Sequence, residues 1–149
     1  MNYKGRILRI IDANINRAKE GSRVCEDIVR LAINDKNSTL KYKKIRHEVS
    51  KIANSSKIRQ YDIIQHRNSK RDVGKRTRIA NSKKEIADIF VANSQRIKES
   101  LRVLEELFCI FDHAASKKFQ NLRFRFYNVE KGCFKKIWNL RNSRYKNLP

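Results

Sequence analysis

An internal repeat is the strongest constraint on how this chain folds. Residues 13–27 and 92–106 align without a gap and are identical at eight of fifteen positions. In a repeat protein each copy is one supersecondary unit, which buries its apolar face only against its neighbour. The segment after each copy carries an arginine at a similar place, Arg46 in the first half and Arg123 in the second. We therefore expect two helix–turn–helix halves, about 6–66 and 82–147, related by a pseudo-twofold axis.

Hydrophobic periodicity predicts that both halves are helical. Apolar residues recur at helical spacing over 6–34, 40–53, 82–111 and from 116 onward, and more weakly over 55–66. Helix breakers are scarce, because the 149 residues include only four glycines and one proline, the last residue. The sequence predicts one all-α domain over 1–149, a helical bundle whose two repeats are joined by a basic loop over residues 67–81.

Local signals predict where the helices begin. Ser38 or Thr39 is the expected N-cap of the second helix, and Ser116 of the fourth. Residues 82–85, Ser-Lys-Lys-Glu, are typical of a capping box that opens the third helix. In the last helix, Trp138 and the phenylalanines are interpreted as packing groups.

Composition and cysteine usage argue against several classes of protein. The longest apolar runs are four or five residues, too short for a transmembrane helix, and the first residues lack the apolar stretch of a signal peptide. Cys25, Cys109 and Cys133 are odd in number and form no Cys-x-x-Cys pair, which argues against a disulfide scaffold or a zinc site. They are expected to be core thiols. We expect a cytoplasmic protein that makes no membrane contact.

The net charge of +21 has two interpretations. Thirty-six lysines and arginines against fifteen acidic residues predict affinity for polyanions, including non-specific nucleic-acid binding that weakens with salt. The abundance of Lys, Asn and Ile indicates instead that the excess is compositional drift. The sequence alone leaves both open.

The residues that both repeats keep are mostly polar, whereas several core positions differ between the copies. This retained polar set comprises Asn14/Asn93, Arg17/Arg96, Lys19/Lys98, Glu20/Glu99, Arg23/Arg102 and Glu26/Glu105. One interpretation is a surface ladder of Glu–Arg pairs, or a buried ionic seam where the halves meet. The other is a charged cleft across the pseudo-twofold axis, in which arginines bind phosphates and glutamates hold Mg²⁺ or orient the arginines.

The basic segment between the repeats is either a flexible linker or a phosphate-binding loop. Six of the twelve residues 67–78 are basic, and they flank Asp72 and Gly74. Gly74 would permit a turn with positive φ that exposes backbone N–H groups to an anion. No Walker motif can be written with the glycines of this chain.

Several of these motifs together resemble a known family. Residues 9–27, with the run Asp-Ala-Asn-Ile-Asn-Arg-Ala-Lys-Glu-Gly at 12–21, residues 67 and 72–74, and residues 92–106 are similar to the helical hydroxymethylpyrimidine-phosphate kinase family. Members of that family stand alone or precede thiamine-phosphate synthase. Two positions depart from its pattern: Ser22 replaces a leucine, and Lys75 replaces a small hydroxyl residue.

The resemblance implies ATP-dependent conversion of 4-amino-2-methyl-5-hydroxymethylpyrimidine phosphate to its diphosphate in thiamine biosynthesis, with ATP as co-substrate and Mg²⁺. Because the acceptor is already an anion, the reaction needs charge neutralisation more than a strong base. The residues predicted to be catalytic are Arg23, Arg102, Arg71 and Asp72. Those predicted to bind substrate are Asn14, Arg17, Asn93, Arg96, Arg46, Arg67, Gly74 and Arg123. The predicted metal ligands are Glu20, Glu26, Glu99 and Glu105.

Two other function classes stay open from the sequence. One is a non-enzymatic nucleic-acid-binding protein, favoured by the charge; glutamates within the retained polar set argue against it, because they would repel phosphates. The other is a structural or regulatory module of the synthase. The oligomeric state is also open, a homo-oligomer included.

Overall fold

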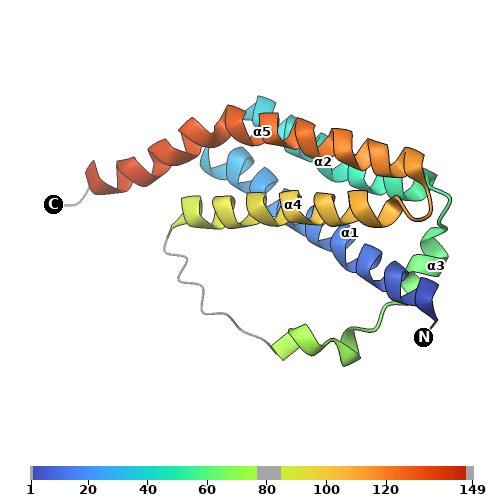
Figure 1. Ribbon diagram of the computed structural model, residues 1–149. Helices are drawn as coiled ribbons and strands as arrows, with labels where there is room; N and C mark the ends of the chain where they lie inside the picture. The colour runs from blue at the N-terminus through green and yellow to red at the C-terminus, as the bar shows by residue number, and fades with distance from the viewer. Residues whose placement is uncertain (1, 77–84, 147–149) are drawn as a thin grey trace.

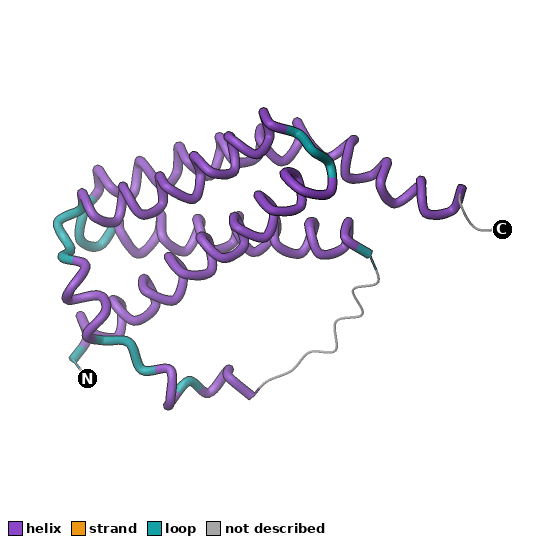
Figure 2. Tube along the Cα trace, turned by 180° about the vertical axis from the view of Figure 1, so that it is seen from behind, coloured by secondary structure: helices purple, strands orange, loops and turns teal. Residues whose placement is uncertain are grey.

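The computed structural model describes residues 2–76 and 85–146, and every regular element within these ranges is helical (Figures 1 and 2). The prediction of an all-α bundle is confirmed. The long helices are α1 (Tyr3–Asp27), α2 (Lys36–Ser55), α4 (Ile86–Phe108) and α5 (His113–Lys146). The short elements are a π-helical turn (Ile28–Ala32), α3 (Gln60–Gln65) and two 3₁₀ turns (Ser69–Arg71 and Val73–Arg76).

The four long helices pack in a ring, in which α1 contacts α2 and α4, and α5 contacts the same two helices from the other side (Figure 1). The core between them is apolar and aromatic. Tyr42 of α2 meets Phe90 of α4 and Phe126 of α5 edge to face, with ring centroids 6.0 and 5.9 Å apart. These aromatic contacts join three helices at one level of the bundle and add to the energy of burying the rings.

The two repeats are equivalent in the fold down to single contacts. Asn14 in α1 donates its amide to the carbonyl of Ile10, at 2.9 Å, and Asn93 in α4 donates to Ile89, at 2.8 Å. The copies α1 and α4 pack against each other, and so do α2 and α5, as a pseudo-twofold arrangement requires. The sequence repeat is therefore also a repeat of structure.

The predicted N-caps of α2 and α5 are wrong, because in each case an upstream aspartate caps the helix. Asp35 accepts the backbone N–H of Ser38 at 3.1 Å and its hydroxyl at 2.7 Å, so α2 begins at residue 36. Asp112 accepts the N–H of Ala115 at 3.1 Å, so α5 begins at residue 113. Ser116 instead donates its hydroxyl to the carbonyl of Glu105, at 2.8 Å.

The capping box of α4 is displaced from its predicted position. Glu85 is the N-cap, and its side chain and that of Asp88 accept each other's backbone N–H groups. Glu85 therefore precedes the helix instead of lying in its first turn. Ser82, the predicted N-cap, lies outside the described residues.

Three aromatic residues predicted to pack in the core are exposed. Phe119 and Phe126 are buried as expected, but Phe124, Phe134 and Trp138 expose 54%, 43% and 45% of their surface. They lie outside the buried stripe of α5 that contains Phe119 and Phe126. Among the cysteines, Cys25 and Cys133 are buried, whereas Cys109 is exposed, which corrects its assignment to the core.

Gly21 lies where α1 packs closely against α4, and it supports a stability prediction. A Cβ atom there would lie 3.0 Å from Cγ1 of Ile97 and 3.1 Å from the backbone oxygen of Asn93. Because helix backbone cannot yield easily, we expect Gly21→Ala to lower the free energy of unfolding by about 1–3 kcal/mol.

The matched control is Gly132→Ala, since a Cβ at Gly132 would meet no atom within 4 Å. That exposed helical position should gain about 0.5–1 kcal/mol from the lower backbone entropy of alanine. Urea unfolding monitored by circular dichroism measures both. Equal effects of the two substitutions would contradict the close approach of α1 and α4.

Candidate functional site

A groove of about 440 Å³ lies between the outer edges of α1 and α4, the two helices that carry the repeat. Its lining residues are Asn14 and Arg17 from α1, and Ala92, Gln95, Arg96, Glu99, Ser100 and Val103 from α4. Four of them, Asn14, Arg17, Arg96 and Glu99, belong to the retained polar set. The groove therefore brings together polar side chains from both repeats, as the cleft interpretation expects.

The two arginines of this groove are repeat-related and exposed. Within residues 2–76 and 85–146, neither Arg17 nor Arg96 has a carboxylate within ion-pair distance. Each guanidinium offers five N–H donors in a planar fork that matches a phosphate. Both are therefore available to an anion.

The polar neighbours of these arginines are held in place. Asn14 is buried, and its amide is fixed on Ile10. The carboxylate of Glu99 accepts a hydrogen bond from Gln95, at 3.0 Å, and among the described residues its second oxygen has no hydrogen-bond partner. One carboxylate beside bound phosphates is a common way for a protein to hold Mg²⁺. Of the four predicted metal ligands, Glu99 alone is among the lining residues.

A second part of the retained polar set forms an ion-pair network between α1 and α2. Glu26 is buried and accepts Nε of Arg46 at 3.0 Å, and Nη1 of Arg23 lies 3.5 Å from the same carboxylate. Arg23 also pairs with Asp27, at 3.6 Å. These contacts join the two helices of the first half.

The second half repeats this network between α4 and α5. Glu105 is buried and accepts Arg123 at 2.8 Å and Arg102 at 3.0 Å, and Arg102 also pairs with Glu106. The hydrogen bond to Glu105 raises the pKa of Arg123 above its ordinary value. The ladder interpretation thus holds for these residues. The seam lies inside each half, however, and not where the halves meet.

These networks separate the predicted site residues into two groups. The first group lies outside the groove. In it, Arg23 pairs with Glu26 and Arg102 pairs with Glu105. The two glutamates also bind arginines of the following helix, Arg46 and Arg123. Glu20 is exposed on α1 and Asn93 lies on α4, and neither is among the lining residues. No cluster of three or more metal-ligating side chains occurs in the described part of the chain. The roles assigned to these residues stay predictions.

The basic loop is anchored to α1 by a residue that sequence reasoning missed. Arg67 donates two hydrogen bonds, of 2.6 and 2.7 Å, to the carboxylate of Asp12, which is buried. Arg9 donates to the carbonyl of Asn68, at 2.9 Å. The Asp12 carboxylate raises the pKa of Arg67. The sequence held a signal for this contact: Asp12 lies beside the buried stripe of α1, and a basic segment downstream can pair with it.

The predicted turn at Gly74 is wrong, because Gly74 does not have a positive φ. Its N–H is donated to Oδ1 of Asp72, at 2.9 Å, which leaves that donor engaged. Arg71 and Asp72 are exposed. Their catalytic roles stay predictions, and residues 77–81 of the predicted loop lie outside the described residues.

The bidentate pair at Asp12 gives a local prediction. In Asp12→Asn the loop loses its charged anchor, so we expect trypsin to cleave after Arg67, Lys70 or Arg71 several-fold faster, with little change in far-ultraviolet circular dichroism. The control is Asp62→Asn, which removes a surface ion pair with Arg59 at the start of α3. Timed digestion with mass spectrometry measures both; equal cleavage rates would contradict the anchor.

The comparison with known proteins assigns the chain to a family. The model of the ThiD2 family matches residues 9–132, so the chain belongs to the ThiD2 family. Curated relatives named thiamine-phosphate synthase are 33% identical over 128 residues in Synechocystis sp. and 34% over 125 residues in Prochlorococcus marinus strain AS9601. These alignments cover 85% and 84% of this chain but 36% and 34% of the relatives. The chain thus spans about a third of their length.

No solved structure matches the chain. In the part of the chain that the structure describes, no helix combines the length and the apolar character needed to cross a membrane.

Proposed function

We propose that this chain acts in thiamine biosynthesis as a kinase that converts hydroxymethylpyrimidine phosphate to the diphosphate with ATP. Membership of the ThiD2 family and the names of the matched relatives support the pathway. The observation that carries the phosphoryl-transfer step is the pair Arg17 and Arg96. They come from equivalent positions of the two repeats, line one groove, and lack the carboxylate partners that the other retained arginines have.

The chemistry requires two polyanions to approach each other. A phosphate oxygen of the pyrimidine substrate forms a bond to the γ-phosphorus of ATP, the bond from that phosphorus to the β,γ-bridging oxygen breaks, and ADP leaves. Two guanidinium groups facing one groove reduce the repulsion between the reactants and stabilise charge on the transferred phosphoryl group. The acceptor is already ionised, so no strong base is needed.

Two further residues of the groove support specific binding. The hydrogen bond to Ile10 fixes the side-chain amide of Asn14. The rest of that amide would therefore meet a pyrimidine or phosphate in one orientation. Glu99 fits a magnesium ion bound to the phosphates, because Mg²⁺ commonly takes one carboxylate together with phosphate oxygens. When bound, Mg²⁺ would supply further charge neutralisation. Glu99 would hold it at the edge of the groove nearest Gln95.

The direct test is turnover by purified protein with ATP, Mg²⁺ and hydroxymethylpyrimidine phosphate, followed by anion exchange of the products. We expect equimolar diphosphate and ADP. ADP without diphosphate would indicate hydrolysis only, and no product from folded protein would overturn the proposal for this chain. Replacing ATP with a non-hydrolysable analogue should abolish the product.

A further inference from the structure

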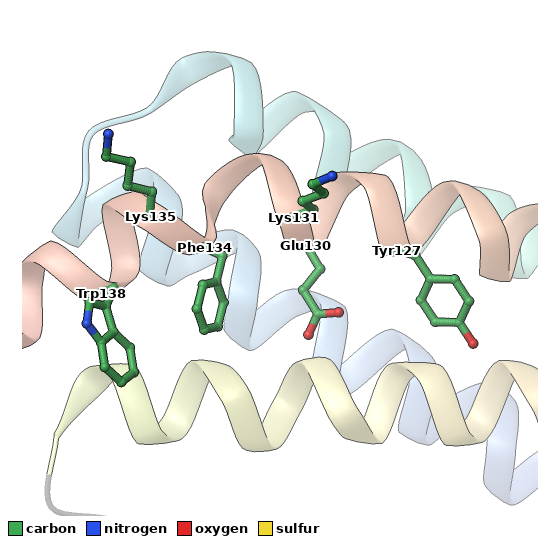
Figure 3. Close-up of a pocket in the computed structure, with 6 residues that line it drawn as sticks. All are labelled: Tyr127, Glu130, Lys131, Phe134, Lys135 and Trp138. Carbon is green, nitrogen blue, oxygen red and sulfur yellow. The ribbon is translucent and has the colours of Figure 1, made fainter.

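A second groove lies along α5, on a different side of the bundle from the α1–α4 groove. It has a volume of about 720 Å³ and is lined by Tyr127, Glu130, Lys131, Phe134, Lys135 and Trp138 (Figure 3). Figure 3 shows the aromatic rings and Glu130 directed toward α4, and the two lysines along the opposite edge. These residues follow one another at helical spacing, so they form a continuous outer stripe on α5.

Two aromatic rings of this stripe are exposed and lie beside each other. The ring centroids of Phe134 and Trp138 are 6.0 Å apart with an interplanar angle of 21°. Cζ of Arg141 lies over the ring of Trp138, 5.2 Å from its centroid, and adds a positive charge beside the aromatic pair. Large aromatic groups are seldom left exposed together on a protein surface without a binding role.

The charge of this groove favours an anion. Glu130 is its one acidic residue, and Lys98 of α4 binds it at 3.1 Å. Among the residues that the structure describes, Lys131 and Lys135 have no carboxylate within ion-pair distance. Over residues 113–146 the sequence carries ten lysines and arginines and one glutamate. The groove thus combines stacked aromatic rings with unpaired positive charge.

The shared chemistry of the family does not account for this groove. The family match ends at residue 132, so Phe134, Lys135 and Trp138 lie beyond it. Lys98 of the retained polar set contacts this groove through Glu130, but Lys98 does not line the α1–α4 groove. The observations therefore concern a surface separate from the groove assigned to phosphoryl transfer.

We propose that the outer face of α5 binds single-stranded nucleic acid. Unpaired bases stack on exposed aromatic rings, and lysines beside the rings contact the backbone phosphates; together these recognise single strands with little sequence preference. A double helix offers no free base faces to Phe134 and Trp138. A second copy of the chain fits this groove less well. It would place Lys131 and Lys135 against the same lysines of the other copy, and two chains of charge +21 repel each other.

Trp138 makes the proposal directly testable, because it is the only tryptophan in the chain. Its fluorescence therefore reports on this groove. We expect a dT₁₂ oligonucleotide to quench the emission and to bind more tightly than a duplex of equal length. Heparin, a polyanion without bases, should bind through charge but leave the emission of Trp138 nearly unchanged.

Variants separate stacking from net charge. Fluorescence anisotropy of labelled dT₁₂ should show about tenfold weaker binding to Phe134→Ala/Trp138→Ala, and near wild-type binding to Trp138→Phe, which keeps a ring. Lys131→Gln/Lys135→Gln should weaken binding and reduce its salt dependence. The control Lys43→Gln/Lys44→Gln removes the same charge from the exposed side of α2 and should have a smaller effect. Circular dichroism verifies the fold of each variant.

Three results would overturn the proposal. The first is equal affinity for dT₁₂ and duplex with no quenching of Trp138. The second is an equal loss of affinity in the two lysine variants, which would assign binding to net charge. The third is a wild-type dimer, detected by light scattering, that dissociates in Phe134→Ala/Trp138→Ala while dT₁₂ affinity stays unchanged. That result would identify α5 as an interface between copies.

Discussion

Replacing Arg96 with alanine should lower kcat/KM for the proposed kinase reaction by about a hundredfold, while the protein stays folded. A hundredfold loss corresponds to about 2.7 kcal/mol of transition-state stabilisation, in the range of removing one charged donor from a phosphoryl-transfer site. Arg96 is exposed and has no ion-pair partner among the described residues, so its removal breaks no ion pair. We expect an unchanged melting temperature. Arg17→Ala should behave in the same way, because it occupies the equivalent position of the first repeat.

Two controls make this prediction specific to the groove. Arg96→Lys keeps the charge but loses the planar fork, so it should recover part of the activity. Arg30→Ala removes an exposed arginine from the π-helical turn after α1, which does not line the groove, and should leave kcat/KM nearly unchanged. Full activity of both Arg17→Ala and Arg96→Ala would show that the groove between α1 and α4 is not the site of the reaction.

The fold was largely predictable, because its determinants are local. Scarce helix breakers and regular apolar spacing predicted the helices, and the repeat predicted that α1 corresponds to α4 and α2 to α5. The N-caps were less predictable, because Asp35 and Asp112 compete with nearby serines, and sequence alone does not show which oxygen reaches the free N–H groups. Capping preferences are similar for Asp and Ser, so the choice depends on the chain direction that the bundle imposes.

The candidate site was predicted only in part, although the spacing of its residues held the missing information. Arg17 and Glu26 are nine residues apart, which is 2.5 turns of a helix with 3.6 residues per turn, so they lie on opposite sides of α1. The retained polar set therefore cannot line one cleft. Arg17 and Arg96 lie in the α1–α4 groove, whereas Glu26 and Glu105 face the following helix of their own half.

The outer face of α5 was not predicted, because aromatic residues were assigned to the core by type. Phe126 and Phe134 are eight residues apart, a spacing at which two residues lie near the opposite edges of one helical face. The apolar residues of α5 therefore follow two stripes. Only the packing of α5 against α2 and α4 shows that one stripe is buried and that the other, with Phe134 and Trp138, is exposed.

Replacing Glu105 with alanine should destabilise the protein more than any other single change in the retained polar set, by about 3 kcal/mol. Its carboxylate binds Arg102 and Arg123, and the side chain of Arg123 is only 10% exposed. Without Glu105 a buried guanidinium loses its counter-charge. Glu26→Ala should cost less, about 1–2 kcal/mol, because the side chain of Arg46 is 22% exposed and water can solvate part of it. Urea unfolding of both variants measures the difference.

The matched control is Glu106→Ala, which removes a partner of Arg102 whose side chain is 58% exposed. It should cost about 0.3–0.5 kcal/mol, as for other surface ion pairs within a helix. If Glu105→Ala cost no more than this, the network between α4 and α5 would not be structural.

Glu105→Gln tests the predicted metal role separately. A variant with intact stability, lost turnover and a higher Mg²⁺ requirement would place Glu105 in the reaction. Destabilisation with turnover retained below the unfolding transition would assign it to the α4–α5 contact, because a neutral amide cannot balance the charge of Arg123.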